Sequence, residues 1–214
     1  MSSLLPAAAA AVPLASGWSV HSLFLRRRLT AAGRDPLSGL LRREAFETAA
    51  ARLLRKQPVA VAVIDLDGFK QINDHHGHAA GDAVIRAAGA ALFEAVDGRG
   101  VAARLGGDEF AAVVPMRDPF ALPGLLSGLH GCLTAPLAHE GRTLRVGASV
   151  GGVHAPAGAD VAAALRRADE SMYAAKAVGG GWWIAPPGKP PAGTVNGRRA
   201  GRKGTAGGTE GGAG

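Results

Sequence analysis

The segment from Arg104 to Phe110 places two glycines and two carboxylates between two apolar runs, Val101 to Leu105 and Phe110 to Val114. Paired glycines between strand-like runs predict a β-hairpin, and glycine lets a ligand approach the backbone closely. Neighbouring side chains of a strand point to opposite faces, so only one of Asp108 and Glu109 can point at a given ligand. Taken alone, the segment also fits a plain hairpin tip with solvated acids.

The composition allows one domain of ordinary size. The chain has 214 residues, of which 47% are apolar and only 5% are aromatic, so alanine, valine and leucine must fill most of the core. A single cysteine, Cys132, excludes an internal disulfide. We expect it to be a small buried apolar residue.

The net charge of +7 is concentrated at the two ends. Residues 1–34 carry four arginines and no acid, and residues 185–214 are rich in Gly, Pro and basic side chains. The central residues 35–184 are close to neutral, which argues against a nucleic-acid partner. These differences predict an apolar N-terminal segment with a basic linker (1–34), a folded domain (35–184) and a disordered tail (185–214).

The first 25 residues have no charged side chain apart from His21, and Arg26-Arg27-Arg28 follows. One interpretation is a membrane helix whose C-terminal end faces the cytoplasm, which would anchor the domain to the inner face of the cell membrane. The other is a linker helix of a cytoplasmic protein, favoured by Pro6, Pro13 and Gly17. Both interpretations remain open at this stage.

The run from Val59 to Leu66 predicts a buried central strand that ends in Asp65-Leu66-Asp67-Gly68. Carboxylates at the end of such a strand often face a ligand. Asp67-Gly68 also suits a simple turn, an explanation that fits Asp65 less well.

Helical spacing and break signals predict the other elements. We expect helices over 40–56, 69–75, from Gly81-Asp82 onward, over 120–133 and from Asp160 to Gly179; a hairpin or paired strand over 142–153, broken at Gly151-Gly152; and a short strand at 182–184. This order predicts an α+β fold with a mainly antiparallel central sheet flanked by helices. The run His75, His76 and His78 lacks thiols and the spacing of zinc fingers, so we do not expect a zinc site.

Six ordered blocks of this chain resemble the GGDEF-domain diguanylate cyclases over Asp35 to about Gly181. The blocks are Asp35 to Leu40, Asp65 to Asp74, Gly77 to Asp82, Arg104 to Phe110, Ser149 to Gly151, and Ala168 to Lys176. The resemblance implies a nucleotide-cyclase-like fold with a ferredoxin-like core. It also implies an enzyme, a nucleotidyltransferase that condenses two GTP into cyclic di-GMP and releases two pyrophosphates.

The resemblance assigns the metal to Asp65, the Leu66 carbonyl and Asp108, with Mg²⁺ as cofactor and Mn²⁺ as an alternative. Catalysis falls to Asp108, at the position of the family's proposed proton acceptor, and to Glu109. Phosphoryl transfer needs such a cation to neutralise oxygen charge, and Mg²⁺ prefers hard oxygen ligands.

The resemblance assigns substrate binding to Asn73, His78, Asp82, Gly106, Gly107 and Lys176. A carboxylate such as that of Asp82 accepts both guanine N–H donors, which adenine lacks. Simpler roles stay open: Asn73 as a cap, Asp82 as a helix-start residue and Lys176 as a solvated helix end.

The family reaction requires a homodimer, because one subunit binds one GTP. Three departures from the family pattern stand out: Ser38 and Arg42 replace Thr and Asn, Gly180 replaces an arginine that follows the phosphate lysine, and Asp97-Gly98-Arg99-Gly100 replaces the Arg-x-x-Asp of product inhibition. The alternative function is a catalytically weak domain that acts as a GTP-binding or partner-binding regulatory module.

Overall fold

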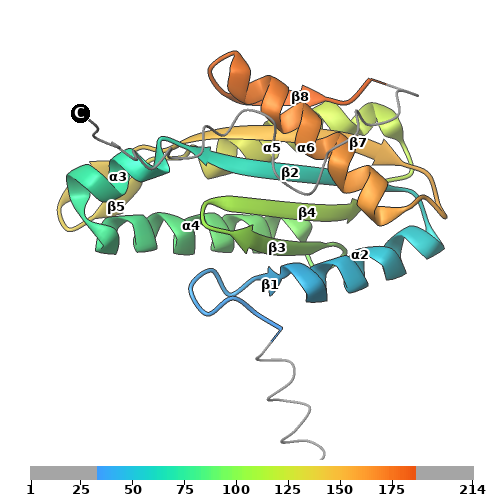
Figure 1. Cartoon of the computed structure of the whole chain (residues 1–214), viewed down its shortest axis with the longest axis horizontal. Helices are drawn as coiled ribbons and strands as arrows, with labels where there is room; N and C mark the ends of the chain where they lie inside the picture. The colour runs from blue at the N-terminus through green and yellow to red at the C-terminus, as the bar shows by residue number, and fades with distance from the viewer. Residues whose placement is uncertain (1–32, 187–214) are drawn as a thin grey trace, which may run out of the picture.

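The structure is a computed structural model that describes residues 33–186. A six-stranded sheet in the order β1-β3-β4-β2-β7-β8 forms its centre, and a separate hairpin, β5-β6, lies beside it (Figure 1). The expected α+β fold with a mainly antiparallel sheet is confirmed, but the sheet is mixed. Both edge strands run parallel to their neighbours, β1 to β3 and β8 to β7.

The elements predicted from the sequence follow one another in the expected order, and the short elements β1, η1 and β5 are present in addition. They are β1 (Leu41–Arg42), α2 (Arg43–Lys56), β2 (Val59–Asp67), α3 (Phe69–His76), α4 (His78–Val96), β3 (Val101–Gly106), β4 (Glu109–Pro115), the 3₁₀ turn η1 (Pro119–Ala121), α5 (Leu122–Leu133), β5 (Leu137–His139), β6 (Arg142–Leu144), β7 (Gly147–Ala155), α6 (Val161–Ala177) and β8 (Gly181–Ile184).

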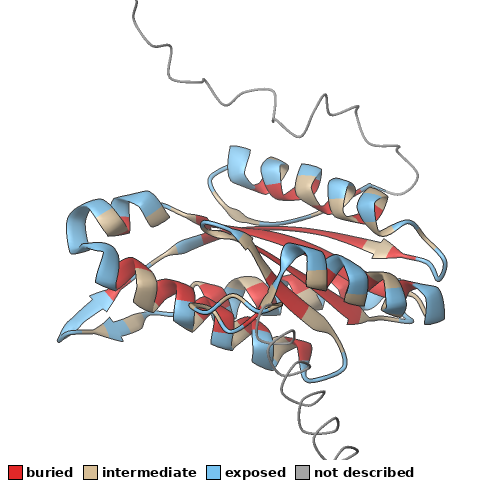
Figure 2. Ribbon diagram, turned by 60° about the horizontal axis from the view of Figure 1, so that its bottom comes forward, coloured by how far each residue is buried: buried red, intermediate tan, exposed pale blue. Residues whose placement is uncertain are grey.

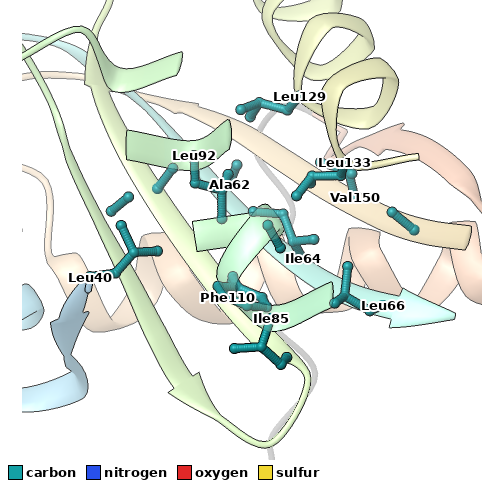
Figure 3. Packing of buried hydrophobic residues seen from close by; sticks show 14 of the residues in the cluster. Leu40, Ala62, Ile64, Leu66, Ile85, Leu92, Phe110, Leu129, Leu133 and Val150 are labelled. Atoms are coloured by element: carbon teal, nitrogen blue, oxygen red, sulfur yellow. The ribbon is translucent and has the colours of Figure 1, made fainter. Parts of the chain in front are cut away.

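Strand β2 is the centre of the sheet, with β4 and β7 paired antiparallel on its two sides. Its first eight residues are buried, because helices cover both faces of the sheet (Figure 2). Alternate side chains of β2 therefore enter two different cores. Ala62, Ile64 and Leu66 pack in one of them with Leu92 and Leu129 (Figure 3).

The two cores contain different helices. Buried residues of α4 and α5 pack in the core that includes Ile64, whereas Phe46 of α2 and Met172 of α6 pack in the opposite core around Val61. Alanine and valine make up most of the core around Val61, whereas leucine and isoleucine are frequent in the core that includes Ile64.

Gly151-Gly152 does not break a strand, contrary to the expectation from the sequence. Strand β7 runs through both glycines, and its Gly151 lies against the backbone of α6. A Cβ at Gly151 would lie 2.0 Å from Met172 N and 2.1 Å from Ala168 O. A Cβ at Gly152 would lie 2.6 Å from Leu126 of α5. Glycine is needed here because helices approach the strand from both faces.

Two further expectations are wrong, and others lie outside the described residues. Helix α4 starts at His78 rather than at Gly81-Asp82, so Asp82 does not open it. Cys132 is exposed, and its Sγ donates to the Leu129 carbonyl at 3.1 Å. The N-terminal segment 1–25 and the tail beyond 186 lie outside the described residues. Within 33–186, no helix is long and apolar enough to cross a membrane.

Candidate active site

The hairpin β3-β4 brings its acidic residues to the end of the central strand. Strand register places Glu109 directly opposite Asp65, and Leu66 N donates to the Asp108 carbonyl at 3.2 Å. The β3-β4 pairing shifts register between Arg104 and Gly106. The expected metal ligands and catalytic residues, which are about 40 residues apart in the sequence, therefore lie side by side.

Gly106, the last residue of β3, and Gly107, the first residue of the hairpin turn, have positive φ angles of 149° and 55°. No other atom lies within 4 Å of where their Cβ atoms would be. Residues other than glycine rarely adopt such backbone angles. The hairpin tip thus presents bare backbone to the space around it.

Asp65 is a buried carboxylate with a cation beside it. Its side chain is 6% exposed, and Lys176 Nζ donates to its Oδ1 at 2.5 Å. Lys176 lies in the last turn of α6, which packs against β2 and β7. The expected phosphate lysine and the expected metal ligand are therefore in direct contact in this structure.

Asp67, two residues further along β2, is held separately from Asp65. Ser149 Oγ lies 2.9 and 3.0 Å from its two carboxylate oxygens. A Cβ at Gly180 would lie 2.9 Å from Asp67 Oδ2, and Gly180 has a φ of +104°. The structure thus gives position 180 a backbone conformation that suits glycine and not the arginine of the family pattern.

The residues expected to bind the base lie on α3 and α4, immediately after β2. A Cβ at Gly81 would lie 2.0 Å from Asn73 Oδ1, so the Asn73 side chain lies over the Gly81 backbone beside Asp82. Asp82 Oδ2 is 3.6 Å from Arg86 Nη2 in a half-exposed pair. His78 is exposed at the start of α4. The structure brings the Asn73 side chain against Gly81, the residue before Asp82, and the missing side chain of Gly81 makes this approach sterically feasible.

Asp35 and Arg104 form a contact that the sequence did not predict, although both lie in family-like blocks. Arg104 Nη1 donates to Asp35 Oδ1 at 3.1 Å, and its Nε donates to the Gly107 carbonyl at 2.8 Å. Burial tends to raise the pKa of the Asp35 carboxyl, but hydrogen bonds from Ser38 and Arg104 outweigh it, so the pKa lies below its ordinary value. Ser38 supplies both its N–H and its Oγ, each at 2.8 Å.

A cavity of about 720 Å³ lies on one side of the hairpin. Gly106 and Gly107 line it, but the other residues expected to bind substrate, Asn73, His78, Asp82 and Lys176, do not. Its walls are formed by Gly33, Asp35, Arg42, Arg43, Glu44, Ala45, Arg104, Leu105, Gly106 and Gly107. Two of the residues that depart from the family pattern are therefore near this hairpin: Arg42 lines the cavity, and Ser38 bonds to Asp35. Neither is among the residues expected to bind the base.

Fold and site together define an α+β domain with an acidic hairpin over the end of a buried central strand. A family model described as "Diguanylate cyclase, GGDEF domain" matches residues 32–181. The chain belongs to the GGDEF family.

Known proteins with the same domain differ in size and in what is known of them. An uncharacterized 19.3 kDa protein of Streptomyces ambofaciens is 42% identical over 79% of this chain and 91% of its own length. The diguanylate cyclase DgcP of Pseudomonas aeruginosa is 34% identical over 68% of this chain, but the match spans only 22% of DgcP. A crystal structure of the coiled coil and GGDEF domain of DgcB from Caulobacter crescentus, in complex with c-di-GMP, has a TM-score of 0.73 at 26% identity. It covers 86% of this chain and all of that one.

Proposed function

We propose that this protein is a diguanylate cyclase that condenses two GTP into cyclic di-GMP. Each 3′-oxygen forms a bond to the α-phosphorus of the other GTP, each α–β phosphoanhydride bond breaks, and two pyrophosphates and two protons are released. The observation that carries the proposal is the cluster at the end of β2, where Asp65 faces Glu109 and contacts Lys176 while Leu66 bonds to Asp108.

The donor set at this cluster fits a hard divalent cation. Asp65, the Leu66 carbonyl and Asp108 offer oxygen atoms only, which Mg²⁺ prefers and Mn²⁺ accepts. Within 33–186 no group of three or more His, Cys, Asp or Glu side chains forms a metal site, but this set needs only two carboxylates. The ion pair of Lys176 with the buried Asp65 supports this assignment, because it already places a positive charge beside the carboxylate. When bound, the cation supplies charge neutralisation on the phosphate oxygens.

The other residues bind and orient the nucleotide. We assign guanine recognition to Asn73 and Asp82, with His78 as a further contact, because an amide beside a carboxylate matches the donors and acceptor of the base. Gly106 and Gly107 present backbone N–H groups to the phosphates, and Lys176 supplies a positive charge. Asp108 accepts the proton of the attacking hydroxyl, and Glu109 supports the cation site.

The reaction needs two copies of the chain facing each other, since each copy carries one set of these residues. We therefore propose a homodimer as the active form. A dimer formed only at high protein concentration would make the specific activity depend on that concentration.

The test is incubation of the full chain with GTP and Mg²⁺, followed by chromatographic identification of the product. We expect cyclic di-GMP and two equivalents of pyrophosphate. Asp108→Asn should lower the rate by about 10²- to 10⁴-fold, because it removes the proton acceptor. Asp97→Asn, in an exposed pair with Arg99 that includes none of the proposed site residues, serves as the matched control and should retain the wild-type rate.

Two outcomes would reject the proposal. One is turnover of ATP in preference to GTP, which would contradict the assignment of Asp82. The other is the absence of product even when two copies are joined by a covalent cross-link or a fused dimerisation segment.

The alternative is a GGDEF domain that binds GTP or a partner without turnover. It is favoured by Gly180, whose backbone conformation disfavours the arginine of the family pattern. GTP binding by calorimetry without product from the enforced dimer would establish this alternative.

A further inference from the structure

The contact between Lys176 and Asp65 joins two groups that the proposed function assigns to different ligands. Asp65 would hold the divalent cation, and Lys176 would hold the nucleotide phosphates. In the structure Lys176 Nζ is 2.5 Å from Asp65 Oδ1 and so occupies the surroundings of the carboxylate itself. One of the two partners must change before both ligands can bind.

The two residues differ in their freedom to move. Asp65 is fixed in the central strand between β4 and β7, and its side chain is 6% exposed. Lys176 extends from the last turn of α6 on a flexible four-carbon stem, and its side chain is 43% exposed. Lys176 is therefore the partner that can leave.

The charges around Asp65 determine when Lys176 leaves this carboxylate. A buried carboxylate without a counter-charge is strongly unfavourable, so Lys176 stabilises Asp65 in the free protein. An ammonium and a divalent cation at the same carboxylate repel each other. The triphosphate of a nucleotide offers the displaced ammonium a new set of anionic oxygens.

We propose that Lys176 is a built-in counter-cation of the metal site, which the divalent cation displaces and the nucleotide phosphates then bind. This inference rests on the proposed function for the identity of the two ligands. It predicts that metal and nucleotide bind cooperatively: each raises the affinity for the other by the same factor. Gly180 has no side chain that could assist Lys176 at either the carboxylate or the phosphates.

The test uses Mn²⁺ as a probe that electron paramagnetic resonance detects, titrated into the full chain with and without a non-hydrolysable GTP analogue. Mn²⁺ held by free analogue is subtracted with a parallel titration without protein. For the wild type we expect weak binding alone and an affinity about 5- to 150-fold higher with the analogue. Lys176→Met should bind Mn²⁺ several-fold more tightly than the wild type without nucleotide, and the gain from the analogue should shrink.

Lys56→Met is the matched control, because Lys56 also lies in the last turn of an exposed helix end, that of α2. It should behave as the wild type in both titrations. If Lys176→Met binds Mn²⁺ no more tightly than the wild type without nucleotide, the proposal is wrong.

A second measurement on the wild type does not depend on the folding of a variant. Lysines are labelled briefly with an amine-reactive reagent and read by mass spectrometry, with Lys56 as internal reference. Labelling of Lys176 should rise when Mn²⁺ is added alone and fall again when the analogue follows. No change on adding saturating Mn²⁺ would overturn the displacement. Because neither readout involves product formation, a chain that displaces Lys176 but makes no cyclic di-GMP would reject the proposed function alone.

Discussion

Arg104 connects the turn before β1 to the acidic hairpin. Its guanidinium donates to Asp35 and to the Gly107 carbonyl, and both side chains of the Asp35–Arg104 pair are less than 20% exposed. Asp35 in turn accepts two hydrogen bonds from Ser38. One carboxylate thus links the hairpin to the chain 69 residues earlier.

Asp35→Asn should lower the free energy of unfolding by about 1–3 kcal/mol at pH 7, because it leaves a part-buried arginine without its charged partner. Urea unfolding followed by circular dichroism measures this. Asp97→Asn removes a comparable Asp–Arg contact of 3.2 Å whose side chains are 72% exposed, and should change stability by less than about 0.5 kcal/mol. If both variants lost the same free energy of unfolding, burial would not be the reason for the stronger effect of the Asp35–Arg104 pair.

The difference in free energy of unfolding between the wild type and Asp35→Asn should depend on pH, and its direction follows from the pKa of Asp35. Because the folded-state pKa of Asp35 lies below its ordinary value, its contribution to stability is fully present above about pH 4 and is lost as the pH falls through the folded value. The difference in free energy of unfolding between the wild type and Asp35→Asn should therefore become smaller below about pH 4. A gap that widened there would show that the sign is wrong.

At the scale of elements, the contact between α6 and β7 positions the lysine of the site. Gly151 lets the backbone of α6 lie directly on the strand, and Ser149 on the same strand holds Asp67. A side chain at 151 would move the helix away from the sheet. Such a movement would also displace Lys176, which lies one turn beyond Met172.

Gly151→Ala should destabilise the protein by about 1–3 kcal/mol or more, since its Cβ would meet helix backbone that cannot rotate away. Gly128→Ala on α5 is the matched control, because no atom lies within 4 Å of its Cβ position. It should be neutral or stabilising by up to about 1 kcal/mol, as alanine favours a helix. Thermal unfolding of both variants tests this, and similar melting temperatures would contradict the close approach.

The elements were predictable where the signal was local. The apolar run of β2, the glycines of the hairpin and the Asp160 cap, which accepts from Ala163 N at 2.8 Å, all correspond to observed features. Gly151-Gly152 was misread because glycines inside a strand look like a break until the packed helices are known. The parallel edges β1 and β8 could not be foreseen either, since short strands carry little pattern of their own.

For the whole molecule, the turn after α4 bears on regulation. Asp97 has a φ of 47° at the end of the helix, and Arg99 Nε contacts its carboxylate at 3.2 Å. A Cβ at Gly100 would lie 2.4 Å from the Val113 carbonyl oxygen. The turn therefore has no room for the aspartate that the family pattern places at position 100.

We expect that added cyclic di-GMP does not lower the initial rate through this turn. The measurement is pyrophosphate release at fixed GTP with increasing cyclic di-GMP. Simple competition with GTP disappears at saturating substrate, whereas feedback through a separate site persists. Persistent inhibition that Arg99→Ala abolishes would contradict this prediction.

The sequence allowed us to expect that Asp65 and the hairpin acids lie close together, but not which contacts they make. Strand register explains why Asp65 and the hairpin acids come together, as the sequence blocks suggested. The pairing of Lys176 with Asp65 joins residues 111 apart and follows from the docking of α6, which no local pattern encodes. The roles of Asn73, His78 and Asp82 remain predictions until a nucleotide is bound.

Helix α6 packs directly on the main chain of β7 at Gly151, and this packing has an evolutionary consequence. Main-chain atoms are the same whatever side chains the helix carries, so most positions on its outer surface can mutate without shifting its axis. The outer surface of this helix can therefore vary while Lys176 still reaches Asp65, provided that the lysine and Gly151 are retained.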